Sequence, residues 1–457
     1  MPKKFRTVDR STPHLMPAQV EDWLPEDDLA RFVVDIVDRL DTSAIEDSYD
    51  ARGSKAYHPK LMAALLIYSY ATGTFSSRKI EKRTYDSIPH RFICANQHPD
   101  HDTICRFRHR FWDEVTGLFL QVLLIAGEMG MVEVGNVAVD GTKMNANASK
   151  HKALSWDRAN QLEEQLTEEI EELLETAEAI DEEEDEDGPG GLDIPEEIQR
   201  REKRLEGIRE AKERIEKRAR ERHEEEVNHY EEKMDRRAEY EEEHGRKKPG
   251  REPEEPEYEG PEDKAQANLT DPESRIMLTS ENGWQQAYNL QAAVDMDSHL
   301  ILTGHVSQSP NDKQELEPAL EQIDELPERL GEADRLAADN GYLSAGNVAA
   351  CEEQGITPYI ATGRKKHNPS WKERLTGPEE DPPEDEEGIE AMAYRLETLE
   401  GKAFYGRRKG TVEPIFGAIK EVMGLRRLLV RGLKKVEAEW TLVQLAWNVR
   451  RMFALQG

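Results

Sequence analysis

Three acidic residues in this sequence are placed where a fold can bring carboxylates together. Asp140 ends the apolar run Gly135-Asn-Val-Ala-Val-Asp140, and Asp339 ends the run Arg335-Leu-Ala-Ala-Asp339. Each run has the length of a buried strand and is followed by Gly within two residues. An acid at the C-terminal end of a strand is where α/β sheets place catalytic groups. The third acid is Glu413, near a predicted helix start, and the three could share one metal site.

Glu413 lies at the beginning of this predicted helix. Thr411 is a candidate cap, and Pro414 fits only a first helical turn. Lys420, seven residues on, completes nearly two turns and returns to the same face. An acid and a cation would then project together behind the basic run Arg407-Arg408-Lys409, which suits a metal ligand beside a phosphate backbone. The alternative for this stretch alone is a solvated helix end with an acid near its positive dipole.

Three carboxylates at one sheet edge indicate phosphodiester chemistry. Two divalent ions about 3.5–4 Å apart can activate a water or a 3′-hydroxyl and stabilise the leaving oxygen of an in-line displacement. Mg²⁺ (or Mn²⁺) suits ligation by oxygen alone and needs few protein ligands. We therefore expect a magnesium-dependent site formed by Asp140, Asp339 and Glu413.

The composition indicates a large protein in which part of the chain lacks a core. The 457 residues are 34% charged and 37% hydrophobic, and two or three domains are expected for this length. The longest apolar stretches, Leu61–Tyr68 and Leu118–Ala126, are far shorter than a membrane span, and no apolar run follows the basic start. The 3 scattered cysteines form no disulfide framework. We expect a cytoplasmic protein with no membrane partner.

The net charge of −33 is unevenly distributed. Acidic residues are concentrated in residues 153–264, whereas residues 402–435 are strongly basic. Because phosphate contacts need Lys and Arg, a uniformly acidic surface would argue against a nucleic-acid partner. The separate basic segment keeps DNA as a candidate partner.

Residues 1–130 are predicted to form an all-α domain. Asp28–Leu40 and Pro59–Gly73 are amphipathic, and Asp102 is a candidate cap for a further helix. The exposed side of that helix would carry three cations suited to phosphate contact, Arg106, Arg108 and Arg110. This pattern favours a DNA-binding domain, although a helical bundle with an ordinary charged surface would show the same residues.

Residues 153–264 form an acidic insertion with helical periodicity. Apolar residues recur every three or four positions on both sides of the break Asp187–Gly191, which predicts an antiparallel coiled-coil hairpin. The second arm is longer than the first, so part of it must overhang, pair with another chain or fray. A Pro/Glu-rich linker, 248–261, returns the chain to the core. The insertion as a whole is either a solvated spacer or an arm that serves in dimerisation or clamps DNA.

Without the insertion, residues 131–152 and 265–457 alternate between strands and helices. The predicted order is a strand ending at Asp140, strands Gln286–Asp295 and His299–Ser307, helix Asp312–Leu326, a strand ending at Asp339, helix Ser344–Gln354, strand Thr357–Ala361, the helix of Glu413 and an apolar helix, Trp440–Phe453, docked on the sheet. Lys372–Glu387 is predicted to be an acidic loop, and Asp295 an ordinary strand-end turn. The fold class is therefore an α/β core with a mixed sheet flanked by helices.

The motifs around these acids resemble those of a known family. Their carriers are Ala138-Val-Asp-Gly-Thr-Lys143, Thr270-Asp-Pro-Glu-Ser-Arg275, Tyr288-Asn-Leu-Gln-Ala-Ala-Val-Asp295, Ala338-Asp-Asn-Gly-Tyr342 and Val412-Glu-Pro-Ile-Phe-Gly-Ala-Ile-Lys420. Together they are similar to bacterial insertion-sequence transposases, whose DDE core has the RNase H-like, retroviral-integrase-type fold. The resemblance covers most of the chain and includes the helical N-terminal domain.

The resemblance implies that Asp140, Asp339 and Glu413 are the catalytic, metal-binding triad. It also implies phosphate or DNA contacts by Tyr405, Arg407, Arg408, Lys409 and Lys420. Glu413 and Lys420 keep the family's spacing, whereas Tyr405 and Arg408 lie one residue further upstream and Lys409 occupies the usual Arg position.

The implied function is a Mg²⁺-dependent transposase. Such a protein binds the terminal inverted repeats of its element, cleaves there and joins the 3′-hydroxyl ends to target DNA. We expect a homodimer in the active complex and a nucleoid-associated location. Two alternatives remain: a metal-dependent nuclease that cuts without joining, and an inert DNA-binding or scaffolding protein whose arm is the working part.

Overall fold

The computed structural model describes residues 19–49, 55–149, 152–182, 194–247, 249–279, 283–363, 377–378 and 388–457. It divides into two compact units. Unit 1 comprises Met1–Met144, Asn289–Leu428 and Lys434–Gly457, and unit 2 comprises Asn145–Tyr288 and Leu429–Leu433. The predicted break at 187–191 and most of the predicted acidic loop at 372–387 lie outside the described residues. None of the helices in the described segments combines the length and the apolar character needed to cross a membrane.

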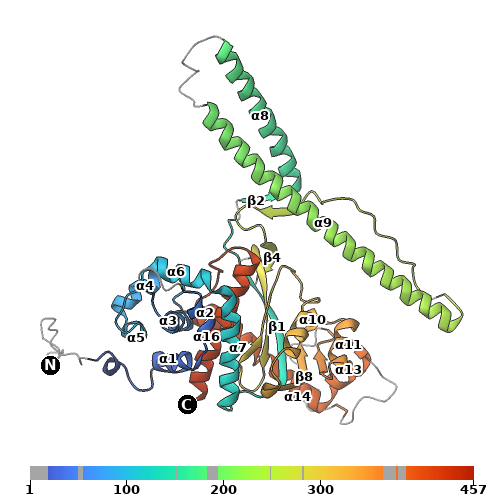
Figure 1. Cartoon of the computed structure of the whole chain (residues 1–457). Coiled ribbons are helices and arrows are strands. Elements are labelled where there is room, and N and C mark those ends of the chain that lie inside the picture. The colour runs from blue at the N-terminus through green and yellow to red at the C-terminus, as the bar shows by residue number, and fades with distance from the viewer. Residues whose placement is uncertain are drawn as a thin grey trace, which may run out of the picture. The chain divides into compact units, whose positions relative to one another are not determined.

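The N-terminal part of unit 1 is helical, as predicted (Figure 1). Its elements are η1 (Glu21–Trp23), α1 (Leu29–Arg39), α2 (Ser43–Asp47), α3 (Pro59–Ala71), α4 (Ser77–Asp86), α5 (Ile88–Ile93), α6 (His101–Arg110) and α7 (Trp112–Glu128). Asp28 caps α1 by accepting a hydrogen bond from the Ala30 amide, and α1 buries one apolar face. The predicted cap of α6 was wrong: Asp100, not Asp102, accepts from the Thr103 amide, at 2.7 Å.

His90 on α5 is a buried histidine whose ring is held neutral. Its side chain is 3% exposed, Nδ1 pairs with the Ser87 hydroxyl at 2.9 Å, and Nε2 pairs with the Ser69 hydroxyl at 3.4 Å. Burial, and secondarily the charge of Arg83, lowers the pKa of His90 from 6.5 to about 4. The folded helical domain therefore keeps the His90 ring neutral at pH values at which the same ring in the unfolded chain would be protonated.

We expect acid to destabilise the protein through His90. In the unfolded chain the ring takes up a proton near pH 6.5, whereas in the folded chain it does so only near pH 4. Because the folded pKa is depressed, the stabilisation is present above pH 6.5 and is lost as the pH falls through about 4. The free energy of unfolding should drop by about 2.5 kcal/mol between about pH 7.5 and about pH 4.5. Denaturant unfolding of wild type and His90→Gln at several pH values measures this drop in the free energy of unfolding. If both proteins lose the same free energy between these pH values, His90 is not its cause.

The core of unit 1 is a mixed β-sheet, as predicted. Its strands are β1 (Val134–Asn145), β5 (Gly283–Asp295), β6 (Ile301–Thr303), β7 (Val306–Ser307), β8 (Gly331–Ala338) and β9 (Thr357–Ile360). They are ordered β5-β1-β8-β9, with β6 and β7 paired antiparallel to β5. β8 runs parallel to both β1 and β9, and Ala138 faces Ala337 in the β1–β8 ladder.

Several element ends differ from the prediction. β1 continues five residues beyond Asp140, to Asn145, and the strand predicted for His299–Ser307 is divided into β6 and β7. The helix predicted to begin at Asp312 begins at Leu316, because the Asp312 side chain is hydrogen-bonded to residues of β1 and β5 instead of to its own helix end. Asp295 accepts from the Ser298 amide at 2.7 Å, so it is the strand-end turn that was predicted.

Helices cover this sheet in the order expected for an α/β unit. They are α10 (Leu316–Asp324), η3 (Glu328–Leu330), η4 (Asn340–Tyr342), α11 (Ala345–Glu353), α13 (Gly388–Glu397), α14 (Leu399–Arg408), α15 (Val412–Gly417), the π-turn η5 (Ala418–Val422) and α16 (Leu433–Leu455). The Trp440 indole on α16 donates to the Gln291 carbonyl at 3.0 Å, and Asn448 exchanges two 2.8 Å hydrogen bonds with the Ile301 backbone. The apolar C-terminal helix is therefore docked on the sheet, as predicted.

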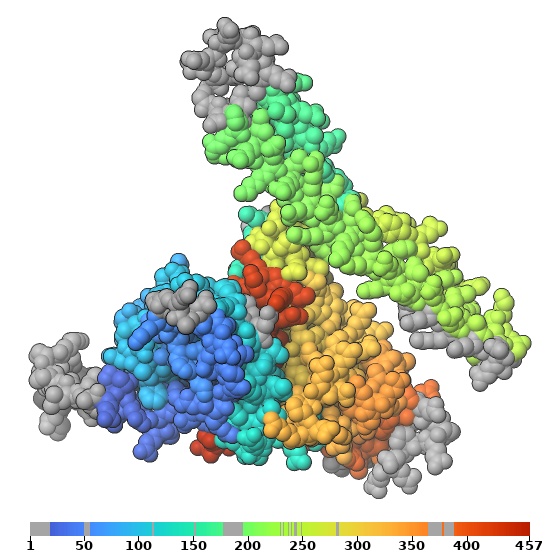
Figure 2. Space-filling model, viewed as in Figure 1, coloured from blue at the N-terminus to red at the C-terminus, as the bar shows by residue number. Residues whose placement is uncertain are grey.

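Unit 2 contains a long helical hairpin. Its elements are β2 (Ala153–Ser155), α8 (Trp156–Glu182), α9 (Ile194–His244), β3 (Gln266–Asn268) and β4 (Arg275–Thr279), which pairs with residues 283–287 of β5. Glu163 pairs with Lys212 at 2.6 Å and Glu169 with Arg201 at 2.9 Å, so α8 and α9 run in opposite directions (Figure 1), and their atoms pack side by side (Figure 2). The apolar residues predicted to face each other, including Leu166, Leu205, Ile208 and Ile215, are buried in one cluster.

The second helix of the hairpin is longer than the first, as predicted. α9 has 51 residues and α8 has 27. The linker after α9 runs back along the extra length (Figure 1). The Arg237 guanidinium donates to the carbonyls of Gly250 and Arg251, and the His223 and Tyr258 rings lie 5.4 Å apart. The overhanging part of α9 is therefore partly covered by the chain's own linker.

Candidate active site

The β1–β8 ladder brings two of the predicted acids to the same end of the sheet. The parallel pairing includes Ala138↔Ala337, two residues before both Asp140 and Asp339. Asp140 remains in β1, whereas Asp339 follows β8 and caps the short helix η4 by accepting from the Gly341 amide at 2.7 Å. Sequence segments almost 200 residues apart are therefore adjacent because their strands are neighbours.

Arg408 connects Asp140 to the third acid. This residue ends α14, and its Nη1 donates to Asp140 Oδ2 at 2.9 Å. Its Nη2 lies 3.7 Å from Glu413 Oε1, at the beginning of α15. The Arg408 side chain is 7% exposed and that of Asp140 16%, whereas that of Glu413 is 55% exposed. One buried guanidinium thus lies between the acid of β1 and the acid of α15.

The electrostatics of Asp140 link it to Asp339 as well. Burial raises the pKa of Asp140 from 3.8 to about 6, the charge of Arg408 opposes this shift, and the charge of Asp339 adds to it. The Asp140 Oδ1 atom also accepts from the Gly141 amide at 2.8 Å. All three predicted acids therefore act on the same small region, with Arg408 as its counter-charge.

The carboxylates do not form a closed ligand cluster in the described part of the chain. There, no three His, Cys, Asp or Glu side chains are placed to hold an ion together. The donor set itself fits a hard divalent cation, because all three predicted ligands are carboxylates. Since Arg408 contacts both Asp140 and Glu413, a cation bound by these two acids would compete with its guanidinium.

Lys420 and Tyr405 lie beside this region. Lys420 Nζ donates to the Thr142 hydroxyl at 2.6 Å, two residues after Asp140. Lys420 lies in η5, where the helix widens, and not in a regular α-helical turn. The Arg408 guanidinium carbon lies 5.9 Å from the centre of the Tyr405 ring, and burial raises the pKa of Tyr405. Thr411, the predicted cap, donates its hydroxyl to the Arg407 carbonyl at 3.0 Å instead.

The predicted DNA-contacting arginines of α6 have different environments. Arg106 and Arg110 are exposed, and the Arg110 guanidinium lies over the Tyr49 ring at 4.9 Å. Arg108 is buried, with Nη1 donating to the Tyr70 hydroxyl and to the Phe75 carbonyl, each at 3.1 Å. Because Arg108 is engaged inside the helical domain, we do not propose it as a DNA contact.

The basic run Arg407-Arg408-Lys409 at the end of α14 is divided in the same way. Arg407 donates to Asp297 at 2.6 Å and to the Met296 carbonyl at 3.1 Å, and its surface remains exposed. Lys409 is exposed at the end of α14. Arg408, between them, is turned inward toward Asp140. Of this run, Arg407 and Lys409 are thus the two cations available to an outside partner.

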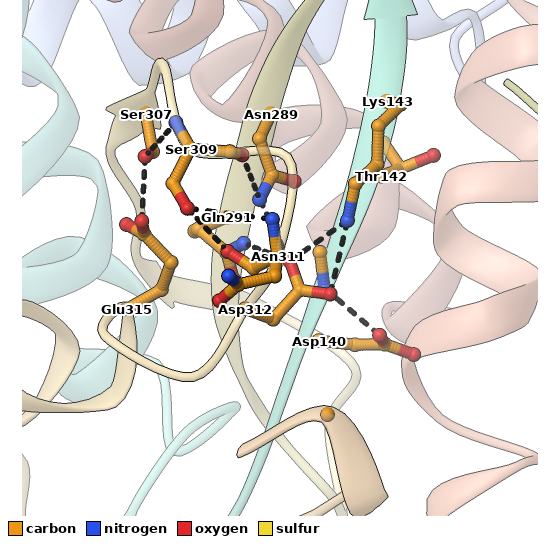
Figure 3. Close-up of polar contacts among 12 residues, drawn as sticks. Asp140, Thr142, Lys143, Asn289, Gln291, Ser307, Ser309, Asn311, Asp312 and Glu315 are labelled. Atoms are coloured by element: carbon orange, nitrogen blue, oxygen red, sulfur yellow. Dashed lines mark hydrogen bonds and ion pairs between the residues drawn. The ribbon is translucent and has the colours of Figure 1, made fainter. Parts of the chain in front are cut away.

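The sequence analysis missed a polar cluster next to Asp140. Asp312 accepts hydrogen bonds from Lys143, Asn289 and Gln291 (Figure 3). Asn289 is 0% exposed and Gln291 1%, so two amide side chains are buried two residues apart on β5. Polar residues at alternate positions of a strand expected to be apolar were the signal that could have revealed the cluster.

Family models match two separate segments of the chain. Residues 18–110 match the model described as Transposase domain (DUF772), and residues 267–449 match the model described as Transposase DDE domain. The second match includes Asp339 and Glu413, whereas Asp140 lies outside both. No curated protein and no solved structure gives a significant match.

Proposed function

The chain belongs to the insertion-sequence DDE transposases, and we propose that it binds the terminal inverted repeats of its own element, cleaves phosphodiester bonds there and transfers the 3′-hydroxyl ends to target DNA. The observation that carries this proposal is the convergence of Asp140 and Glu413 on Arg408, with the charge of Asp339 acting on both Asp140 and Arg408. Three acids from distant parts of the chain thus act on one small region.

The catalytic core is proposed to be RNase H-like. The support is the strand order β5-β1-β8-β9, with β6 and β7 antiparallel to β5 and with β1, β8 and β9 parallel. This order places the strands that lead to Asp140 and Asp339 next to each other in the sheet. Carboxylates can then be presented together at one sheet edge, where α/β folds bind ligands.

Asp140, Asp339 and Glu413 are proposed to hold Mg²⁺ (or Mn²⁺). When bound there, a pair of such ions would supply activation of the attacking hydroxyl and stabilisation of the leaving oxygen of the phosphodiester. The chain's own contribution is positional: β1 and β8 fix the two aspartates, and α15 supplies Glu413 from its first turn. Arg408 balances the buried charge of Asp140 and is available to a phosphate when it leaves that carboxylate.

DNA contacts are proposed for exposed cations on two segments. Arg106 and Arg110 lie on α6, and Arg407 and Lys409 lie at the end of α14. Tyr405 and Lys420 are proposed to act closer to the cleaved strand, since each lies beside a residue of the acidic site. An insertion sequence has two ends, so we propose that the active complex contains a homodimer. We also propose that the protein is associated with the nucleoid.

The test uses purified protein and duplexes that carry the terminal repeats of its element. With Mg²⁺, intact ends should be cleaved at the repeat boundary, and pre-cut ends with a free 3′-hydroxyl should be joined to a target plasmid. Cleavage without joining of pre-cut ends would identify a nuclease. Binding without either reaction would identify an inert DNA-binding protein, and either result would overturn the proposal.

A further inference from the structure

Asp312 is a fourth acid at the end of the sheet that carries the catalytic candidates. It lies in the loop between β7 and α10, and its side chain is 19% exposed. Lys143 Nζ contacts both carboxylate oxygens at 2.9 Å, Asn289 Nδ2 donates at 2.7 Å and Gln291 Nε2 at 3.0 Å (Figure 3). The carboxylate is thus directed at β1 and β5 and makes no contact of this kind with the helix that follows it.

These hydrogen bonds join the segment after Asp140 to the segment after Asp339. Lys143, three residues after Asp140, donates to Asp312, and Gln291 donates to the same carboxylate. The Tyr342 hydroxyl, three residues after Asp339, donates to Gln291 Oε1. A continuous chain of polar contacts therefore runs from the β1 acid segment through Asp312 to the β8 acid segment.

Packing at two glycines places Asp312 close to both acid segments. A Cβ added to Gly141 would lie 2.9 Å from Asp312 Oδ1, and one added to Gly341 would lie 3.5 Å from Asp312 Oδ2. At Gly141 the added Cβ would come even closer to Gln291 Nε2, so the missing side chain leaves room for both partners of this contact, the Gln291 amide and the Asp312 carboxylate. The loop itself is anchored by Asn347, whose amide donates to the Lys313 and Tyr342 carbonyls at 2.8 and 2.6 Å.

The charge of Lys143 explains why an acid is needed here. Its ammonium is a flexible point charge three residues from Asp140. Arg408 already pairs with Asp140. If the Lys143 ammonium were released at this end of the sheet, it would be a second cation that competes with a divalent metal ion for the carboxylates of Asp140 and Asp339. Asp312 binds this ammonium with both oxygens and holds it on the side of β5.

We propose that Asp312 is a positioning residue that retains the Lys143 ammonium on the side of β5, so that Lys143 does not join Arg408 in competing with a divalent cation for Asp140 and Asp339. The inference rests on the proposed function, because it takes those two aspartates as the metal-binding acids. It assigns Asp312 no contact with DNA or with the metal.

The test measures Mn²⁺ binding to the DNA-free protein by electron paramagnetic resonance. Asp312→Asn keeps the shape of the side chain but loses the charge that binds Lys143, so the dissociation constant for Mn²⁺ should rise by about tenfold or more, as for other residues that orient metal ligands. The double variant D312N/K143Q should return to within about threefold of wild type, since the released ammonium is gone. Glu317→Gln, an exposed acid on α10, is the matched control and should bind like wild type.

Thermal unfolding of the same metal-free variants separates positioning from a general loss of structure. A purely structural role would lower the unfolding temperature of D312N and leave Mn²⁺ binding unrepaired in D312N/K143Q. If D312N unfolds at the wild-type temperature but D312N/K143Q still binds Mn²⁺ weakly, Asp312 is a direct metal ligand. If D312N binds Mn²⁺ like wild type, Asp312 has no role in metal binding. Each of these results overturns the inference.

The variant Asp140→Asn distinguishes this inference from the proposed function. If D140N binds Mn²⁺ like wild type, the metal assignment itself fails. If D140N loses binding while D312N does not, the proposed function stands and only the role of Asp312 is rejected.

Discussion

Asp140→Asn, Asp339→Asn and Glu413→Gln should each abolish cleavage of terminal-repeat DNA while leaving binding to that DNA intact. Each substitution removes one carboxylate charge from the proposed metal site and preserves the shape of the side chain. The cleavage rate should fall by more than the roughly 10–100-fold expected when only a supporting residue is lost. Cleavage and gel-shift assays on the same preparations measure the two effects separately.

Two acids serve as controls for these substitutions. Asp334 is an exposed residue of β8, and Glu421 is an exposed residue of η5 that pairs with Arg426. Asp334→Asn and Glu421→Gln lie on the same segments as Asp339 and Glu413 and should cleave like wild type. Metal-dependent cleavage that survives in any of the three site variants would remove that residue from the catalytic set.

Arg408→Met should strongly destabilise the metal-free protein. The substitution leaves the Asp140 carboxylate, which is 16% exposed, without the guanidinium that contacts it at 2.9 Å. Removing one partner of a largely buried ion pair costs about 3–5 kcal/mol when the pair is fully buried, and partial exposure places the expected loss toward about 3 kcal/mol. Denaturant unfolding in the presence of a chelator measures the change in the free energy of unfolding.

A double-mutant cycle isolates the contact between Arg408 and Asp140. The combined variant R408M/D140N should be more stable than the sum of the single effects predicts, by roughly 1–3 kcal/mol, because neither charge is then left unpaired. Arg408→Lys keeps the charge but lacks the planar fork that reaches Asp140 and Glu413 together, so it should recover only part of the loss. Strictly additive single effects would show that the pair contributes nothing to folding.

The strands that carry the aspartates could be predicted because their pattern is local. Val137, Ala138 and Val139, and likewise Leu336–Ala338, are apolar on both faces, which is typical of buried parallel strands. The length of β1 could not be predicted in the same way. Its continuation beyond Asp140 depends on β5, a neighbouring strand of 13 residues that is remote in the sequence.

The side-chain contacts around the candidate site could not be predicted, because they join residues that are far apart in the sequence. The inward direction of Arg408 and the engagement of Asp312 by Lys143 both join segments more than 150 residues apart. Arg108 is a different case. Ile104, Phe107 and Phe111 are buried at helical spacing, and Arg108 lies on the same side of α6 as Ile104, so its burial could have been deduced from the periodicity.

The paired strands β2 and β3 at the root of the helical hairpin have a genetic consequence. Ala153 faces Asn268 and Ser155 faces Gln266, so the chain departs and returns at neighbouring positions. Antiparallel partners lie only about 4.5–5.5 Å apart, a gap that a tight turn closes. Leu154 and Ala267 of these strands are buried in the apolar cluster of the hairpin, so in-frame changes of length are expected to be tolerated in the codons for α8 and α9 beyond that cluster, where the exit and return positions of the chain stay adjacent.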